Sequence, residues 1–155
     1  MASSNHHVGM RVSDLERAAK FYEEAFGATR MCDAFGIDGE LAEMVTVGPK
    51  GVAVKLLPMS FEQGGAIELF EFTEPRKPMV ATHASEDNLM HYAIQVEDTD
   101  AALARAEAAG ATRIWPEVLP MGELRIVYVT DPDGNVIEIL DGTMDEVIEL
   151  IRENF

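Results

Sequence analysis

Two histidines and two glutamates stand at corresponding places in the two halves of this 155-residue chain. His7 and His91 are each followed by apolar residues at the first, third and fifth positions and by an aspartate at the seventh. Glu68 and Glu138 each lie at the centre of an otherwise apolar run of five residues. Imidazole nitrogen and carboxylate oxygen are both ligands of divalent transition metals. The four residues therefore predict a metal site, to which each half contributes one histidine and one glutamate.

Such a site has a definite chemical use. Four protein ligands in an octahedral field leave two adjacent positions open, which a small-molecule substrate with two neighbouring oxygens can chelate. The expected cofactor is one divalent transition metal (Ni, Co, Zn, Fe or Mn), whose charge the two carboxylates partly offset. Any one of these residues alone is better explained as a polar surface side chain. Only the repetition of all four favours the metal site.

The repetition extends beyond the four ligands. The sequence Gly-Ala-Thr-Arg occurs at residues 27–30 and again at 110–113, which is 20 residues after the first histidine and 19 after the second. A repeat of this kind indicates a duplicated module. Two modules paired about a pseudo-twofold axis would form a curved, partly open mixed sheet and bring equivalent residues together around the metal. The expected fold class is α+β, with two tandem β-α-β-β-β modules.

Alternation of apolar and polar residues predicts the strands, and apolar stripes of helical spacing predict the helices. The first module is expected to contain a helix over 13–26 and extended segments at 6–12, 28–33, 41–47, 52–57 and 66–72, with 41–47 and 52–57 forming a hairpin. The second is expected to contain a helix over 99–109 and strands at 89–97, 111–118, 123–130 and 135–141, the last two joined by an Asp-Pro-Asp-Gly-Asn turn. Ser13 with Glu16, and Thr143 with Glu146, predict capping boxes.

These elements divide the chain. We expect a single domain over 1–155, with a first module at about 5–73, a connection at 74–88, a second module at about 89–141 and a C-terminal helix at 143–154. The amphipathic C-terminal helix is expected to pack on the domain or on a second subunit.

Composition narrows the classes of partner. The net charge of −16 and the pI near 4.4 oppose binding to nucleic acid or anionic membranes. No window of about 18 residues is apolar enough to span a membrane, and the N-terminus has no signal-peptide pattern. The single cysteine, Cys32, excludes an internal disulfide and suits a reducing compartment. We expect a cytoplasmic protein with neither nucleic-acid nor membrane partners.

Four pieces of the chain together resemble a known superfamily. They are His7-(x)4-Val12-x-Asp14-Leu15 running into Phe21-Tyr22 and Gly27, then Ile67-Glu68-Leu69, then His91-(x)4-Val96-x-Asp98, and last Asp131-Pro132-Asp133-Gly134-Asn135-x-Ile137-Glu138. The ordered set, which covers roughly residues 6–141, resembles the vicinal-oxygen-chelate superfamily of glyoxalase I, methylmalonyl-CoA epimerase, extradiol dioxygenases and fosfomycin-resistance proteins. The resemblance implies paired modules around one metal held by His7, Glu68, His91 and Glu138, and we also expect a homodimer.

The ligand set favours one branch of that superfamily. A dioxygenase of this kind uses two histidines and one carboxylate, so Glu68 as a fourth ligand argues against ring cleavage. Four ligands are typical of the branch that removes a proton next to a carbonyl through a metal-bound enolate or enediolate. We therefore expect an isomerase or lyase similar to methylmalonyl-CoA epimerase or glyoxalase I. The alternatives are a non-catalytic ligand-binding or resistance protein of the same fold, or a ring-cleaving dioxygenase.

Glu43 and Arg11 are further candidates for functional residues, both by resemblance. Glu43, on the expected strand 41–47, lies in a register similar to the catalytic carboxylate of epimerases, and apolar neighbours that desolvate it would suit a general base. Glu138 is the second candidate for proton transfer, acting from the metal. Arg11 matches a glutathione-contacting arginine of bacterial glyoxalases and is the candidate substrate-binding residue. Phe72 stands where those enzymes place an asparagine, which departs from the glutathione pattern.

Overall fold

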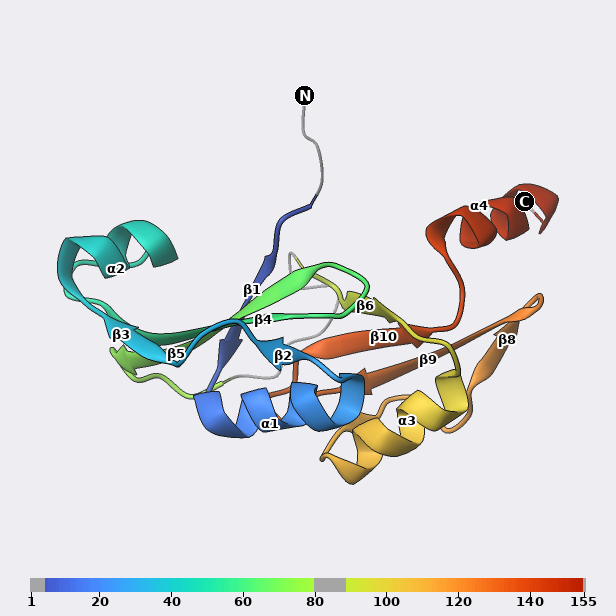
Figure 1. The fold of residues 1–155 in the computed structure, drawn as a ribbon, viewed down its shortest axis with the longest axis horizontal. Coiled ribbons are helices and arrows are strands. Elements are labelled where there is room, and N and C mark those ends of the chain that lie inside the picture. The colour runs from blue at the N-terminus through green and yellow to red at the C-terminus, as the bar shows by residue number, and fades with distance from the viewer. Residues whose placement is uncertain (1–4, 80–88, 155) are drawn as a thin grey trace. The chain divides into compact units, whose positions relative to one another are not determined.

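The computed structural model describes residues 5–79 and 89–154, in two compact units that comprise residues 1–80 and 81–155 (Figure 1). The first unit contains β1 (Val8–Val12), α1 (Leu15–Phe26), β2 (Thr29–Arg30), β3 (Phe35–Ile37), α2 (Gly39–Thr46), β4 (Ala53–Ser60) and β5 (Ala66–Glu74). The second contains β6 (Tyr92–Gln95), α3 (Thr99–Ala108), β7 (Thr112–Arg113), β8 (Leu119–Met121), β9 (Leu124–Thr130), β10 (Val136–Leu140) and α4 (Met144–Asn154). The prediction of an α+β fold with two tandem modules is confirmed.

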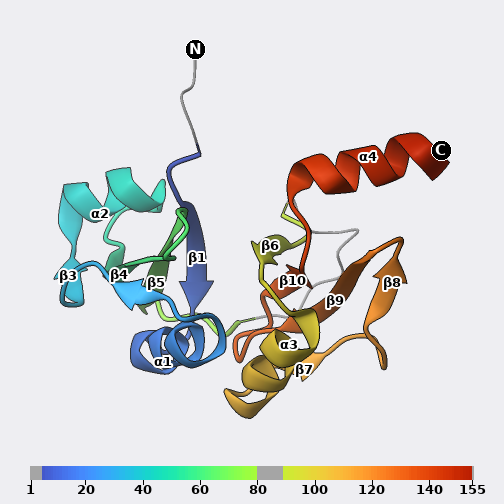
Figure 2. The same ribbon diagram turned by 45° about the vertical axis from the view of Figure 1, so that its right-hand side comes forward.

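The two units have the same sheet topology. The first sheet has the strand order β1-β5-β4-β2 with β3 paired to β4, and the second has the order β6-β10-β9-β7 with β8 paired to β9. In each unit the first strand runs parallel to the last one, and the remaining pairings are antiparallel. Figure 2 shows α1 beside the first sheet and α3 beside the second. The repeat in the sequence is therefore also a repeat in topology.

The aspartate that ends each histidine motif begins the following helix. Asp14 is the N-cap of α1 and its side chain accepts a hydrogen bond from the Arg17 backbone N–H, at 3.0 Å. Asp98 caps α3 in the same way, through Ala101 at 2.9 Å. The predicted capping box at Ser13 is wrong, because the helix begins one residue later. Gly27 ends α1 with a left-handed φ of 67°, as predicted.

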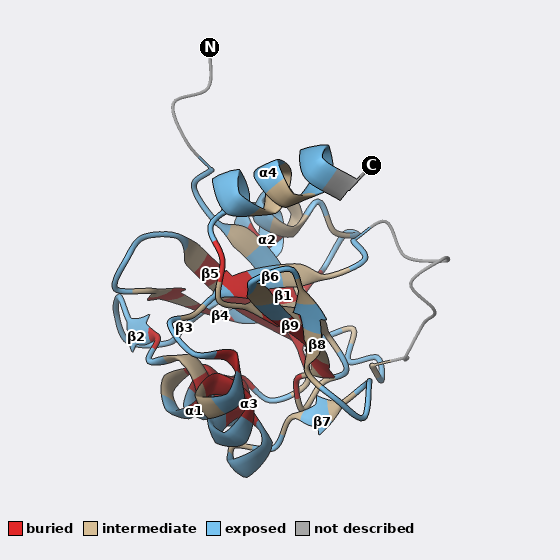
Figure 3. Cartoon of the chain, turned by 90° about the vertical axis from the view of Figure 1, so that its right-hand side faces the viewer, coloured by how far each residue is buried: buried red, intermediate tan, exposed pale blue. Residues whose placement is uncertain are grey.

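One face of each sheet is covered by the helix of its own module. The residues on either side of the two glutamates, namely Ile67, Leu69, Ile137 and Ile139, are fully buried. Figure 3 shows buried stretches in α1 and α3 as well. α1 packs against β4 and β5, and α3 packs against β9 and β10. Because side chains alternate along a strand, Glu68 and Glu138 lie on the opposite face of each sheet, as the alternation predicted.

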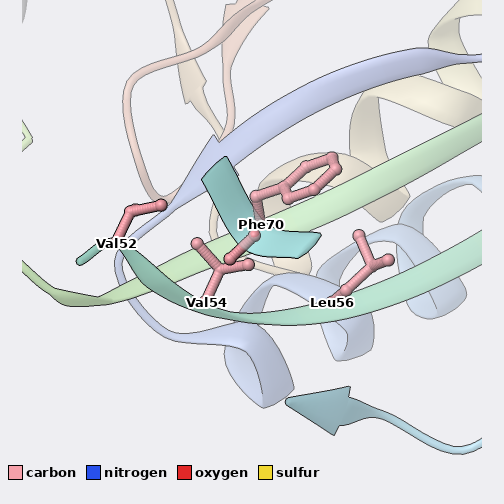
Figure 4. Packing of buried hydrophobic residues seen from close by; sticks show 5 residues of the cluster. Val52, Val54, Leu56 and Phe70 are labelled. Carbon is pink, nitrogen blue, oxygen red and sulfur yellow. The ribbon is translucent and has the colours of Figure 1, made fainter. Parts of the chain in front are cut away.

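The predicted strand at 41–47 is wrong, because this segment is the helix α2. Ala42 packs into a core cluster formed by Val52, Val54, Leu56 and Phe70 (Figure 4). Helical spacing leaves Leu41 and Met44 exposed at 52% and 70%. Strand β4 pairs instead with β3. A run of seven mostly apolar residues suits either a strand or a short helix, so the apolar pattern alone does not distinguish the two.

Several other predicted strands begin or end at different residues in the structure. β1 and β6 each begin one residue after a histidine, so both histidines lie just before their strands rather than within them. The predicted strands 28–33 and 111–118 contain only the two-residue strands β2 and β7. Within the predicted strand 111–118, Pro116 lacks the backbone N–H that a longer strand would donate to its neighbour. β5 extends to Glu74, and residues 80–88 of the predicted connection lie outside the described residues.

The C-terminal helix and the last hairpin follow the predictions. The Thr143 backbone N–H donates to Glu146 Oε2 at 2.7 Å, and the Glu146 N–H donates to Thr143 Oγ1 at 3.3 Å, which forms the predicted capping box. In the turn before β10, Asp131 Oδ1 accepts hydrogen bonds from the Asp133 and Asn135 N–H groups. None of the described helices has the length and apolar character needed to cross a membrane.

Candidate metal centre

The first module brings its histidine and its glutamate together. In the parallel pairing of β1 with β5, Gly9 lies opposite Glu68. His7 precedes Gly9 by two residues, and its Nε2 lies 3.3 Å from Oε2 of Glu68. The side chains are 38% and 25% exposed, so the pair lies at the surface of the unit, where a metal and a substrate have access.

The second module repeats this arrangement in the same register. Ala93 lies opposite Glu138 in the parallel pairing of β6 with β10. His91 again precedes the paired residue by two, and its Nε2 lies 3.0 Å from Oε2 of Glu138. The four sequence-predicted ligands thus form two matching His–Glu pairs, one in each unit. Within the described residues, no group of three or more potential metal ligands gathers at one point, so each pair supplies two donors.

The geometry of each pair fits metal ligation. Two ligands in adjacent octahedral positions, with bonds of about 2.1 Å, lie about 3.0 Å apart. The two Nε2–Oε2 distances of 3.0 and 3.3 Å agree with that separation. Neutral imidazole together with carboxylate is also a donor set suited to a divalent transition metal. Each pair, His7 with Glu68 and His91 with Glu138, therefore offers one nitrogen and one oxygen donor at ligand spacing.

A tyrosine that sequence reasoning missed supports the second pair. The Tyr128 hydroxyl donates to Glu138 Oε1 at 2.8 Å, the carboxylate oxygen that does not face His91. Burial, and then the hydrogen bond to Glu138, raise the pKa of Tyr128 to about 12, so the hydroxyl keeps its proton at neutral pH. The tyrosine ring also lies edge to face against His91 and Trp115, with centroid separations of 5.5 and 5.4 Å.

The sequence contained a signal for this tyrosine. Tyr128 and Glu138 lie at equal distances on either side of Asp133 in the predicted turn, so an antiparallel hairpin centred there pairs them directly, as β9 and β10 do.

The first module differs in the residues around its His–Glu pair. Pro58 lies opposite Glu68, at the position that corresponds to Tyr128. His7 also has a different neighbour from His91, because its Nδ1 lies 2.7 Å from Nδ1 of His6. Alternation along an extended segment would place these two neighbouring histidines on opposite faces, so their contact is not expected from the sequence pattern.

A hollow in the first unit lies on the same sheet face as His7 and Glu68. It has a volume of about 260 Å³ and is lined by Gly9, Arg11, Val45, Thr46, Phe70 and Phe72. The Arg11 guanidinium lies 5.7 Å from the centre of the Phe72 ring and donates to the Lys77 carbonyl oxygen at 2.5 Å. α2 supplies one wall of the hollow, so the helix that replaces the predicted strand also shapes the space beside the first His–Glu pair.

Glu43 lies on α2, and its structural setting differs from the expectation. Its Oε1 accepts a hydrogen bond from the Gly51 backbone N–H at 2.8 Å. The apolar neighbours that were expected to desolvate it turn outward, since Met44 and Val47 are 70% and 93% exposed. The expectation of an apolar shell around Glu43 is therefore wrong. Its role as a base stays a prediction.

Comparison with known proteins gives the family. The model of the Glyoxalase/Bleomycin resistance protein/Dioxygenase superfamily matches residues 4–139. The chain is 30% identical over 147 residues to a 2-epi-5-epi-valiolone epimerase from an Actinomyces species, covering 88% of this chain and 78% of that protein. It is similar to the structure of a glyoxalase family protein from Bacillus cereus, with a TM-score of 0.71 and 26% identity, covering 91% of this chain and 97% of that one.

A more distant structure shares the fold alone. A fosfomycin resistance protein variant from Listeria monocytogenes, solved with Mn(II) and 1S,2S-dihydroxypropylphosphonic acid, has a TM-score of 0.65 and 20% identity, covering 96% of this chain and 98% of that one. The family match spans both modules and both His–Glu pairs. The chain therefore belongs to the glyoxalase/bleomycin resistance protein/dioxygenase superfamily, as its resemblance to the vicinal-oxygen-chelate proteins predicted.

Proposed function

We propose that the protein is a divalent-metal-dependent isomerase that removes a proton from a carbon next to a carbonyl and returns it, with epimerisation as the outcome. The observation that carries the proposal is the matched register of the two His–Glu pairs, each with Nε2 and Oε2 at ligand spacing. The 30% identity to a protein named as an epimerase supports this outcome over the lyase reaction of glyoxalase I.

The proposed metal ligands are His7 and Glu68 of the first unit and His91 and Glu138 of the second. When bound, the ion polarises the substrate carbonyl and offsets the negative charge that develops as the C–H bond breaks. The histidines would bind through Nε2, the atoms that face the carboxylates. The expected substrate is a small molecule with two neighbouring oxygens, and the hollow beside Arg11 would hold the part of it remote from the reacting carbon.

Inversion of a carbon centre needs proton transfer on two faces. We assign one transfer to Glu43 and the other to a carboxylate of the metal set, which the sequence analysis named as Glu138. Glu43 keeps its assignment although it lies on a helix, because α2 forms a wall of the hollow, through Val45 and Thr46. The Gly51 backbone N–H donates to Oε1 of Glu43 and holds this carboxylate in one orientation.

Exchange of substrate protons with solvent deuterium tests the proposal. The metal-loaded protein would be incubated in deuterated water with 2-epi-5-epi-valiolone, 2-oxo compounds and acyl thioesters. Mass spectrometry would then report deuterium at the carbon next to the carbonyl. We expect incorporation into at least one compound with the wild type and none with His91→Ala. Tight binding of one compound, with no exchange across the panel, would instead support the alternative of a ligand-binding or resistance protein.

A further inference from the structure

The two His–Glu pairs match in register but differ in what stands behind the glutamate. In the second unit Tyr128 lies opposite Glu138, and in the first unit Pro58 lies opposite Glu68. Proline has no side-chain donor, so this position cannot hold Glu68 by a hydrogen bond. The duplicated modules are therefore unequal at the position that neighbours each carboxylate ligand.

The contacts around Tyr128 restrict Glu138 from two sides. Its Oε1 accepts the tyrosine hydroxyl at 2.8 Å, while its Oε2 faces Nε2 of His91 at 3.0 Å. The same tyrosine ring packs against the His91 ring, so one residue touches both members of the pair. The Glu138 side chain is 14% exposed, against 25% for Glu68, whose partner His7 lies farther away at 3.3 Å.

Such restraint has consequences for a metal ligand. A carboxylate whose second oxygen is held by a hydroxyl presents one oxygen to the ion in a fixed orientation, which lowers the entropy lost on binding. A carboxylate without that restraint can turn, offer both oxygens or leave the ion at smaller cost. Groups that contact a ligand in this way typically contribute about 10-fold to 100-fold to metal affinity.

We propose that Tyr128 is a positioning residue that makes His91–Glu138 the anchoring half of the metal centre and leaves Glu68 as the exchangeable carboxylate. This inference rests on the proposed metal-dependent function, and it reassigns the mobile carboxylate from Glu138 to Glu68. A ligand that leaves the ion to take part in proton transfer should be the one without a second hydrogen bond. Within the described residues, Glu68 has its ion pair with His7 and no second hydrogen bond, whereas Glu138 also accepts the Tyr128 hydroxyl.

Metal affinity of the full-length chain tests the proposal without any assay of turnover. Co(II) would be titrated into the apoprotein against a competing chelator, and its visible absorption spectrum recorded. We expect Tyr128→Phe to weaken Co(II) binding by about 10-fold to 100-fold. The spectrum should also change, because the released Glu138 oxygen can enter the coordination sphere. Tyr22→Phe, which removes a hydroxyl from the core of the first unit, is the matched control and should bind Co(II) like the wild type.

A double-mutant comparison separates positioning from general packing. In a Glu138→Ala background, Tyr128→Phe should have little further effect on Co(II) affinity, because the side chain that accepts the tyrosine hydroxyl is already absent. An undiminished effect in that background, or a Tyr128→Phe affinity within twofold of the wild type, overturns the positioning role. Retention of Co(II) by His91→Ala would instead overturn the metal site itself, and a wild type that binds no Co(II) overturns both proposals.

The exchangeable role of Glu68 has its own readout in the same titration. We expect Glu68→Gln to weaken Co(II) binding less than Glu138→Gln does, because the anchoring pair is still intact. Equal or greater loss with Glu68→Gln contradicts the division into anchoring and exchangeable halves. Circular dichroism of each variant would verify that the fold is retained.

Discussion

Nε2 of His91 lies 3.0 Å from Oε2 of Glu138, and the pair repeats, residue for residue, the arrangement of His7 with Glu68. The repeat arises because a parallel pairing of the first and last strands places each histidine two residues before the partner of its glutamate. A strand residue and its second neighbour lie on the same face, so the imidazole reaches along that face to the carboxylate. The duplicated motif therefore encodes a duplicated pair of donors.

Removal of a ligand should remove the metal. The purified wild type is expected to contain close to one divalent transition metal per chain by elemental analysis, and His91→Ala and Glu138→Ala are each expected to contain almost none. The remaining three ligands should lose affinity because each alanine removes one donor and disturbs its partner. Glu62→Ala, which removes an exposed carboxylate from the turn between β4 and β5, is the control. Full metal content in both ligand variants would contradict the assignment.

Glu43→Gln should keep the metal and lower kcat by about 10²–10⁴-fold, the usual contribution of a general base. The glutamine side-chain oxygen can still accept the Gly51 N–H, so the turn after α2 should be retained. Glu40→Gln, an exposed change on the same helix, should leave turnover unchanged. Steady-state kinetics on a compound that exchanges deuterium would measure both variants. Unchanged turnover in Glu43→Gln would remove the argument for epimerisation and favour glyoxalase-type chemistry.

Arg11→Ala should raise KM more than it lowers kcat. The guanidinium lines the hollow beside the first His–Glu pair, and loss of one charged hydrogen bond to substrate costs about 1.5–3 kcal/mol, or roughly 10-fold to 100-fold in KM. Metal content should not change, because Arg11 contributes no donor to the ligand set. Arg17→Ala, on the exposed side of α1, serves as the control. A KM within twofold of the wild type would exclude Arg11 from substrate binding.

The capping box of α4 should make stability depend on acid pH. Hydrogen bonds from the Thr143 backbone and then its hydroxyl lower the pKa of Glu146 below its ordinary value of 4.5. The stabilisation is therefore present above that ordinary value and is lost as the pH falls through the lower pKa of the folded state. Chemical unfolding should show Glu146→Gln to be less stable than the wild type at pH 7, with the difference shrinking below pH 4.5. Glu149→Gln, which removes the same charge from the middle of the helix without touching the capping box, is the control.

Local patterns in the sequence determined much of this fold and of the candidate site. Period-two alternation placed Glu68 and Glu138 opposite the buried isoleucines, because side chains alternate across a strand whatever the strand packs on. Gly27 and the Asp131–Asn135 turn were predictable because their residue types favour particular backbone conformations. The repeat of His and Glu identified the four proposed ligands before any contact between them was known.

Tertiary structure decided the rest, because it depends on partners distant in sequence. The segment around Glu43 is a helix whose Ala42 belongs to the same buried cluster as Val54 and Phe70, although its apolar pattern alone suited a strand equally well. The hollow beside Arg11 followed from that helix. The difference between Tyr128 and Pro58 acquired meaning only once the strands paired and set each residue opposite a glutamate. Residue types determine which donors are available, and cross-strand pairing determines which of those donors are held in place.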